Sequence, residues 1–208
     1  VLGDNTILDG RDDGIRVEGG AAVVIGGDGS GEDATGGNYV ASNAGAGIAV
    51  VEGIDGNTTA GDDIRIVGNR TEDNGVGLSV NGVSNVQVGG PDPARSDGVG
   101  PENNFADGVS LVRADGAIVQ GNRISDERDA PTSPLYVASS GVRIGGLGEE
   151  EGNTITGSET LFEQRASAVL VEGVDVRIEG NTIGEDGASA FHGITVTLSG
   201  EGADVAGN

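Results

Sequence analysis

Acidic side chains are the most abundant groups in this sequence that could take part in chemistry. Two adjacent pairs are present, Asp12-Asp13 and Asp62-Asp63. Glycoside hydrolysis needs two carboxyl groups at one sugar linkage, one to protonate the leaving oxygen and one to activate water or attack the sugar. The repeat described below places the two pairs on different rungs, at about 4.8 Å per rung. We therefore interpret them as solvated charge on an acidic surface.

A glycine-rich loop offers oxygen ligands for a calcium ion. Asp28, Ser30, Glu32 and Asp33 lie in the segment Asp-Gly-Ser-Gly-Glu-Asp, whose alternating oxygen ligands suit a flexible Ca²⁺ site. The segment lacks the full EF-hand loop with its terminal Glu. Residues 149–151, three consecutive Glu, form a similar but less defined set. No cofactor is required, Ca²⁺ is the one candidate ion, and a solvated acidic loop is the favoured interpretation.

His192 is the only histidine in the chain. An imidazole titrates near neutral pH and can act as an acid or a base. No catalytic residue is assigned, and His192 remains a weak candidate whose side chain we expect to face solvent.

A repeat carries all of these groups, and its marker is an Asn at one corner. Most of these Asn follow a Gly, and an apolar or small residue stands two positions later. The series is Asn5, Asn38, Asn69, Asn104, Asn122, Asn153, Asn181 and Asn208, at an average interval of about 29 residues. Asn tolerates a left-handed backbone and its amide bonds to nearby backbone, so stacked copies predict an Asn ladder. Asn43 lies outside this phase, and we expect its replacement to have little effect.

Each copy contains three short segments that alternate apolar and polar residues, which predicts three short strands separated by tight corners. The first strands are expected at residues 14–17, 47–50, 77–80, 108–111, 135–137, 168–171 and 193–196. The second strands are expected at 23–25, 64–66, 86–88, 117–119, 142–144, 176–178 and 203–205. The third follows each Asn. One such unit buries its apolar face only against another copy, so the sequence predicts one all-β solenoid of about seven turns across residues 1–208.

Insertions are expected at the corners, where a solenoid tolerates them. Residues 26–37 and 89–103 enlarge the second corner, 52–62 the first, and 126–134 follow a third strand. Residues 158–167 are rich in helix formers and contain capping-box spacing, which predicts a short helical turn.

Composition and charge limit the protein's partners. Gly accounts for 41 of 208 residues and aromatics for 2%, so the interior must be thin and filled by small aliphatic side chains. The net charge is −23, and all 11 basic residues are Arg. Nucleic acid and anionic membrane surfaces both need a basic footprint, so we expect neither as a partner. No apolar run is long enough to insert into a membrane. An acid excess without Lys is similar to proteins of salt-in halophiles, which implies a high-salt environment; the alternative is a solubilising surface on an ordinary acidic protein.

The whole chain resembles the right-handed parallel β-helices of the pectate-lyase-like superfamily, on the Ile-Gly-Gly and Gly-Asn-x-Ile segments of its repeat. The irregular loops are unlike the strict six-residue rhythm of left-handed helices. Polysaccharide-cleaving members carry acidic residues, often with calcium, on the outward faces of their first or third strands. The predicted outward row of the first strands contains no carboxylate: Arg16, Ala49, Ser79, Ser110, Tyr136, Leu170 and Thr195. Polygalacturonase-like members carry Gly-His-Gly-Ile, whereas Phe191 precedes His192 here and the companion Asn-Thr-Asp and Arg-Ile-Lys segments are missing.

One predicted outward row is rich in arginine. The second strands present Val24, Arg65, Gln87, Ile118, Arg143, Arg177 and Asp204. Guanidinium groups at Arg65, Arg143 and Arg177 could hold anionic sugars or carboxylates. The favoured alternative is internal pairing, because Asp63 and Asp175 stand two residues before Arg65 and Arg177 and would share their face.

The sequence favours a non-catalytic, extracellular structural or adhesive solenoid of a surface protein, filament or viral fibre, with glycans as candidate ligands. Its expected partners are the remainder of a longer chain or an assembly, because the sequence begins just before a corner Asn and ends on one. The alternative is a polysaccharide lyase or glycoside hydrolase whose active residues lie in the loops or outside this piece. The sequence leans against an enzyme without deciding the matter.

Overall fold

The computed structural model describes most of the chain, and within the described residues the regular elements are strands. The described residues are 2–20, 22–27, 37–53, 64–90, 104–125, 133–148, 151–156, 167–184, 192–197 and 202–208. Within these ranges, no helix has the length and apolar character needed to cross a membrane.

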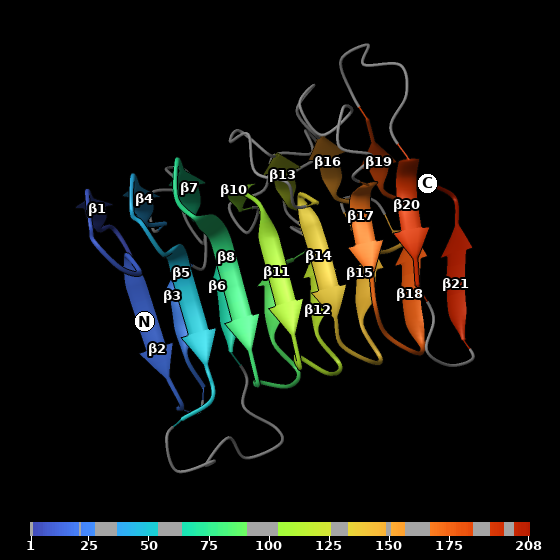
Figure 1. The fold of residues 1–208 in the computed structure, drawn as a ribbon, viewed down its shortest axis with the longest axis horizontal. Coiled ribbons are helices and arrows are strands. Elements are labelled where there is room, and N and C mark those ends of the chain that lie inside the picture. The colour runs from blue at the N-terminus through green and yellow to red at the C-terminus, as the bar shows by residue number, and fades with distance from the viewer. Residues whose placement is uncertain are drawn as a thin grey trace.

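The strands form three parallel sheets of seven strands each, in which every third strand of the sequence is a neighbour (Figure 1). The first-strand sheet contains β2 (Ile15–Glu18), β5 (Ala46–Val51), β8 (Val76–Asn81), β11 (Val109–Val112), β14 (Leu135–Ala138), β17 (Ser167–Val171) and β20 (His192–Val196). The second-strand sheet contains β3 (Val24–Gly26), β6 (Arg65–Val67), β9 (Gln87–Gly89), β12 (Ile118–Gln120), β15 (Arg143–Gly145), β18 (Val176–Glu179) and β21 (Ala203–Ala206). The third-strand sheet contains β1 (Thr6–Leu8), β4 (Tyr39–Ala41), β7 (Arg70–Glu72), β10 (Phe105–Asp107), β13 (Arg123–Ser125), β16 (Thr154–Thr156) and β19 (Thr182–Ile183).

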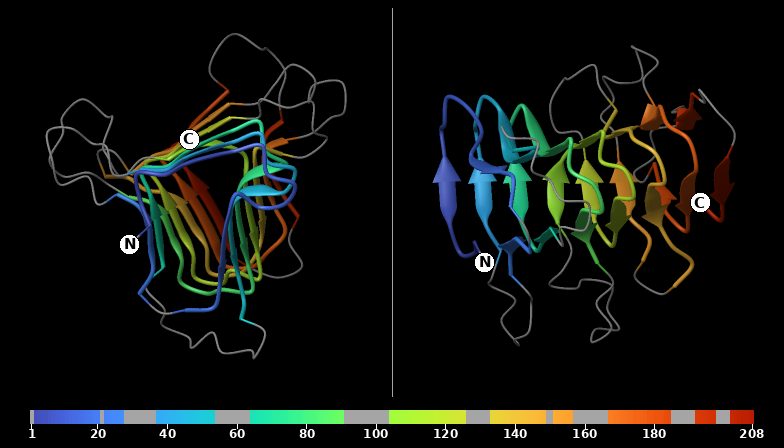
Figure 2. Two further views of the ribbon diagram at one scale, coloured as in Figure 1. Left: turned by 90° about the vertical axis from the view of Figure 1, so that its left-hand side faces the viewer. Right: turned by 90° about the horizontal axis from the view of Figure 1, so that it is seen from below.

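This arrangement confirms the predicted right-handed parallel β-helix of seven three-stranded turns, and each strand overlaps its expected segment. Seen along the axis, the three sheets enclose a narrow interior (Figure 2). Successive rungs are in register, as Ile48 pairs with Leu78 and Leu78 with Val109. One face of each strand therefore lines the interior, where stacked aliphatic side chains such as Ile66, Val88 and Val119 are fully buried.

The predicted Asn ladder lies between the second-strand and third-strand sheets. Each amide nitrogen Nδ2 donates to the Oδ1 of the next rung, from Asn5 through Asn38, Asn69, Asn104, Asn122, Asn153 and Asn181 to Asn208. Asn122 Nδ2 also donates to the carbonyl oxygens of Val88 and Gln120, both at 2.9 Å. The same Oδ1 atoms accept the backbone N–H of the preceding Asn, as Asn153 does for Asn122 at 3.0 Å. The ladder thereby satisfies backbone groups that the tight corner removes from the strands.

A second polar column lies at the corner between the third-strand and first-strand sheets, and it overturns the expectation for Asn43. The column comprises Asn43, Asn74 and Asp107, all buried. Asn43 Nδ2 donates to Asn74 Oδ1 at 2.8 Å, and the Asn74 N–H donates to Asp107 Oδ2 at 2.7 Å. Gly10 N–H donates to Asn43 Oδ1 at 2.9 Å and begins the column. Asn43 is therefore a stacked, buried residue, although it lies outside the main Asn phase.

The predicted helical turn at 158–167 and most of the insertions fall outside the described residues. Ser167, the last residue of that segment, begins β17 and is buried. At the second corner, Gly26 and Gly89 belong to strands β3 and β9 rather than to the loops that follow.

Candidate functional site

The arginine row of the second-strand sheet has the predicted register but a different pairing. Arg65, Arg143 and Arg177 occupy one outward row, with Arg143 directly beside Arg177. Arg143 Nη2 lies 2.9 Å from Glu151 Oε2, and Arg177 Nε lies 3.7 Å from Glu179 Oε1. Arg143 and Arg177 therefore each have a carboxylate neighbour.

The expected pairing of Arg177 with Asp175 is replaced by the pairing with Glu179. Asp175 has a φ of 54°, which belongs to a turn rather than to a strand. Its side chain therefore does not share the strand alternation that places residues i and i+2 on one face. Asp63, the expected partner of Arg65, lies outside the described residues.

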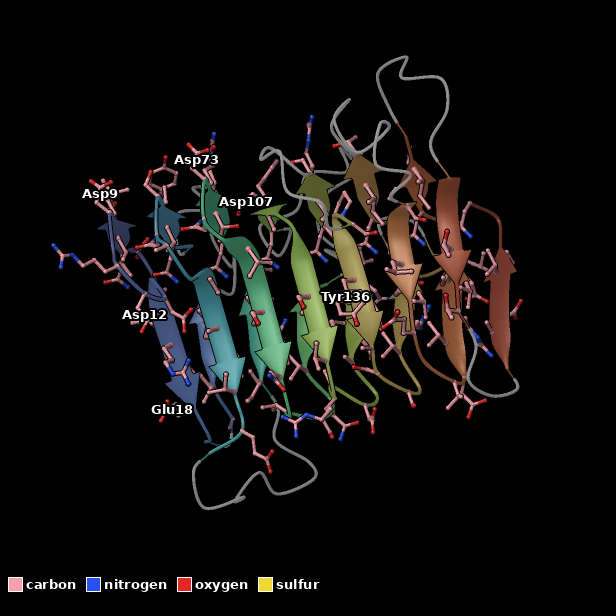
Figure 3. The ribbon with its side chains drawn as sticks, viewed as in Figure 1. Asp9, Asp12, Glu18, Asp73, Asp107 and Tyr136 are labelled. Carbon is pink, nitrogen blue, oxygen red and sulfur yellow. The ribbon has the colours of Figure 1, made fainter. Side chains whose placement is uncertain are left out.

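The outward row of the first-strand sheet also has the predicted register, from Arg16 to Thr195. Its largest side chain, Tyr136, lies on the outer face of β14 (Figure 3) and donates its hydroxyl to Glu172 Oε2 at 2.7 Å. This hydrogen bond raises the pKa of Tyr136 above its ordinary value. The row itself therefore offers one guanidinium, one phenol and no carboxylate.

A groove of about 480 Å³ lies at the ends of the first strands and is lined by Arg16, Glu18, Val51, Glu52, Gly53, Asn81 and Arg113. Its charged groups bind one another or their neighbours. Arg16 donates to Glu18 Oε1 at 2.7 Å, and Arg113 donates to Asn81 Oδ1 at 2.9 Å. Arg16 and Arg113 are therefore already engaged by neighbouring side chains, and we do not assign a ligand to this groove.

The remaining predicted groups divide between structural roles and undescribed segments. Asp13 accepts the Ala46 N–H at 2.8 Å and a hydrogen bond from Arg16 at 2.9 Å. It therefore links the corner before β2 to the start of β5. Asp62, the proposed Ca²⁺ ligands Asp28, Ser30, Glu32 and Asp33, and most of the second acidic run lie outside the described residues. His192 begins β20 and its backbone pairs with Ser167. Among the described residues, no three carboxylate or histidine groups lie together as metal ligands would.

The structure adds a surface that the sequence interpretation missed, on the outer face of the third-strand sheet. Tyr39, Arg70, Phe105 and Arg123 stand side by side on four consecutive rungs. We call them the aromatic-arginine row. Each residue directly follows a ladder Asn, so the position was readable from the repeat. The signal is weak in the sequence because the residue type at this position changes from rung to rung.

A groove of about 280 Å³ lies along this row and is lined by Arg70, Thr71, Glu72, Phe105, Ala106, Arg123 and Ser125. Glu72 organises one end. Its Oε2 accepts the Tyr39 hydroxyl at 2.7 Å and its Oε1 accepts Arg70 Nε at 2.6 Å. These bonds hold the pKa of Glu72 below its ordinary value, the bond from Tyr39 contributing most. The Arg70 guanidinium also lies 5.9 Å from the centre of the Tyr39 ring.

Comparison of the chain with protein-family models, with curated proteins and with solved structures found no match.

Proposed function

We propose that this chain is a non-catalytic structural solenoid, a stiff segment of an extracellular surface protein, filament or viral fibre. The observation that carries the proposal is the uninterrupted stacking of all seven turns. Three sheets and the Asn ladder run in register from the first turn to the last. Seven rungs extend about 30 Å along the axis, which suits a spacer or a scaffold for side-chain rows.

We also propose that the chain is a member of the pectate-lyase-like superfamily. A parallel β-helix supports both enzymes and non-enzymes, so function depends on the groups that the fold presents. A sugar-cleaving member needs carboxylates, a base or a bound metal within reach of one linkage. The first-strand row presents no carboxylate, and the groove on the third-strand sheet is lined by one, Glu72, which already accepts bonds from Tyr39 and Arg70. The lack of a carboxylate pair in either place supports a structural or adhesive role over polysaccharide cleavage.

A cleavage assay tests the proposal. The purified chain is incubated with acidic and neutral polysaccharides, with and without Ca²⁺, and the products are assayed for reducing ends and unsaturated uronates. We expect no products under any condition. Accumulation of either product, followed by its loss in His192→Ala, would replace the structural role with an enzymatic one and make His192 a catalytic residue.

A further inference from the structure

The outer face of the first-strand sheet carries no charged side chain over four consecutive rungs. Strands β5, β8, β11 and β14 lie side by side in register and present two outward residues each (Figure 1). We call these residues the first-strand face. They are Ala49, Val51, Ser79, Asn81, Ser110, Val112, Tyr136 and Ala138.

The lack of charge on this face is notable in a strongly acidic chain. Charged residues make up 22% of the sequence, and the other two sheets carry outward arginines such as Arg70 and Arg143. Charges of both signs border the first-strand face at the ends of its strands, among them Glu52 and Arg113. An uncharged centre within a charged rim is the usual anatomy of a protein–protein interface, because no unpaired charge is buried at its centre.

The first-strand face is also flat. Ala49 is buried, and the other members of the face are half-buried although they point outward. They alternate along their strands with fully buried core residues such as Val50, Val80 and Leu111, which hold the backbone beneath them in place. Small molecules bind in concave sites, whereas a flat sheet suits another sheet, packed about 10 Å away. The shape therefore favours a protein surface as the occupant.

We propose that two copies of the chain pair through the first-strand face, related by a two-fold axis that runs along β8 between them. A second copy offers the same flat, uncharged surface, and a two-fold pair uses one surface twice. This axis sets β5 over the partner's β11, and β2 over the partner's β14. Val51 then lies over the partner's Val112, and symmetry repeats this apolar contact on the other side of the axis.

The charges at the strand ends select this axis. Glu52 follows β5 and Arg113 follows β11 in equivalent positions two rungs apart, and Arg113 Nη1 lies 4.0 Å from Glu52 Oε2 within one chain. Two rungs separate the backbones by about 10 Å, which is also the distance between packed sheets. Arg113 can therefore reach the partner's Glu52 as it reaches its own. An axis along β11 would instead set Arg113 against the partner's Arg113.

The size of the contact predicts a reversible pair. Five strands at about 4.8 Å each, with lengths of about 20 Å, give about 500 Å² of flat face on each copy, or about 1,000 Å² in total. This area belongs to the small, transient interfaces. Each copy carries a net charge of −23, and the resulting repulsion opposes pairing until salt screens it. With a Debye length of about 3 Å at 1 M, salt should strengthen the association.

The inference goes beyond the structural role proposed above, because it names the surface through which the solenoid associates and the partner that it takes. It makes no use of any catalytic group. A pair can form whether or not the chain cleaves polysaccharides, so the outcome of the cleavage assay and the outcome of the association measurements are independent.

Sedimentation equilibrium measures the pairing. We expect a mass that rises from monomer to dimer with protein concentration, and a dissociation constant that falls between about 0.2 M and about 2 M KCl. Ser79→Arg sets two like charges together at the axis and should raise the dissociation constant at least about tenfold. Thr154→Arg is the matched control, because it adds the same charge at a half-buried outward position of the third-strand sheet. It should change the dissociation constant less than about twofold.

A charge exchange between two variants tests the axis itself. Arg113→Glu makes both strand-end positions acidic and Glu52→Arg makes both basic, so each variant alone should pair about fivefold more weakly. An equimolar mixture restores opposite charges between copies and should pair within about twofold of the unsubstituted chain. Like charges remain within each chain, so recovery in the mixture reports contacts between copies alone. Thermal midpoints check that each variant folds, and the exchange stands by itself if Ser79→Arg does not fold.

Several results would overturn the inference. These are a monomeric mass at every concentration, full association in Ser79→Arg, and a mixture that pairs no better than its two components. Loss of association in Thr154→Arg with retention in Ser79→Arg would move the contact to the third-strand sheet. A mass that rises beyond the dimer without limit would indicate an open stack of copies instead of a two-fold pair.

Discussion

At the scale of single residues, the side chains of the Asn ladder each make several buried hydrogen bonds. Asn122 accepts two bonds from Asn104 and donates to Val88, Gln120 and Asn153. Asn122→Ala leaves these buried groups without partners, so we expect a loss of about 1–3 kcal/mol in the free energy of unfolding. Asn181→Ala should behave alike. Denaturant titration measures both.

Asn81→Ala is the matched control for the ladder variants, because Asn81 is only partly buried and accepts one exposed bond from Arg113. We expect it to cost less than about 0.5 kcal/mol. Asn43→Ala should now group with the ladder variants, since Asn43 belongs to the second polar column. If Asn122→Ala and Asn181→Ala cost no more free energy of unfolding than Asn81→Ala, stacking contributes little to stability.

Asp107 should make stability depend on pH in a sense opposite to that of most carboxylates. Burial raises its pKa above the ordinary value of 3.8, against the hydrogen bonds from Asn74 and Thr71. Below pH 3.8 it is protonated in both the folded and unfolded states. As pH rises through the interval up to the raised pKa, the unfolded chain ionises first, so the folded state loses stability.

Asp107→Asn should therefore gain stability relative to the unsubstituted chain as pH rises above 3.8, with a plateau above the raised pKa. The variant also retains an acceptor for Asn74. Urea titration at a series of pH values measures the difference. Asp73→Asn removes one charge from an exposed turn position and reports the general effect of charge. A gain no larger than that of Asp73→Asn would contradict the account of Asp107.

At the scale of elements, second strands that end in Gly alternate with second strands that end in a residue with a side chain, and the reason is steric. Gly26, Gly89 and Gly145 pair with Val67, Gln120 and Glu179 on the next rung. A β-carbon at each glycine would overlap the carbonyl oxygen of its partner. One strand of each pair must therefore lack a side chain where the backbones converge on the ladder.

Gly89→Ala should be strongly destabilising because it combines this overlap with a φ of 73°. Gly184→Ala is the matched control, since Gly184 has a φ of 88° but no atom of the described residues lies within 4 Å of the place that a β-carbon would take. The control should cost about 1–2 kcal/mol for the left-handed backbone alone, and Gly89→Ala clearly more. Equal thermal midpoints for the two variants would remove the steric explanation.

The same elements show how far sequence reasoning reached. Strand positions and outward rows followed from strict alternation and from one Asn per turn, because both are local and repeated signals. The second polar column was missed since it has only three members and its last is an Asp at a strand end. The partner of Arg177 was missed because a positive φ at Asp175 interrupts the alternation on which the expectation depended. The groove on the third-strand sheet could not be predicted, because it depends on which neighbouring rungs leave space between their side chains.

At the scale of the whole molecule, charge repulsion should set the conditions under which the chain folds. The net charge is −23, and exposed ion pairs such as Arg16 with Glu18 are individually weak. Salt screens that repulsion, with a Debye length of about 3 Å at 1 M. We expect the thermal midpoint to rise between about 0.05 M and about 2 M KCl, as the proposed high-salt origin requires. An unchanged midpoint would argue against that origin.

The ladder also gives the molecule a polarity. Every side-chain link within it points the same way, with the donor on the earlier rung and the acceptor on the later one. The two ends of the ladder therefore differ chemically even though the rungs are alike. A further rung could extend it only in the same sense, because the reverse orientation would set like groups against each other. Growth by stacking would thus be vectorial, and would generate an open fibre rather than a closed symmetric pair.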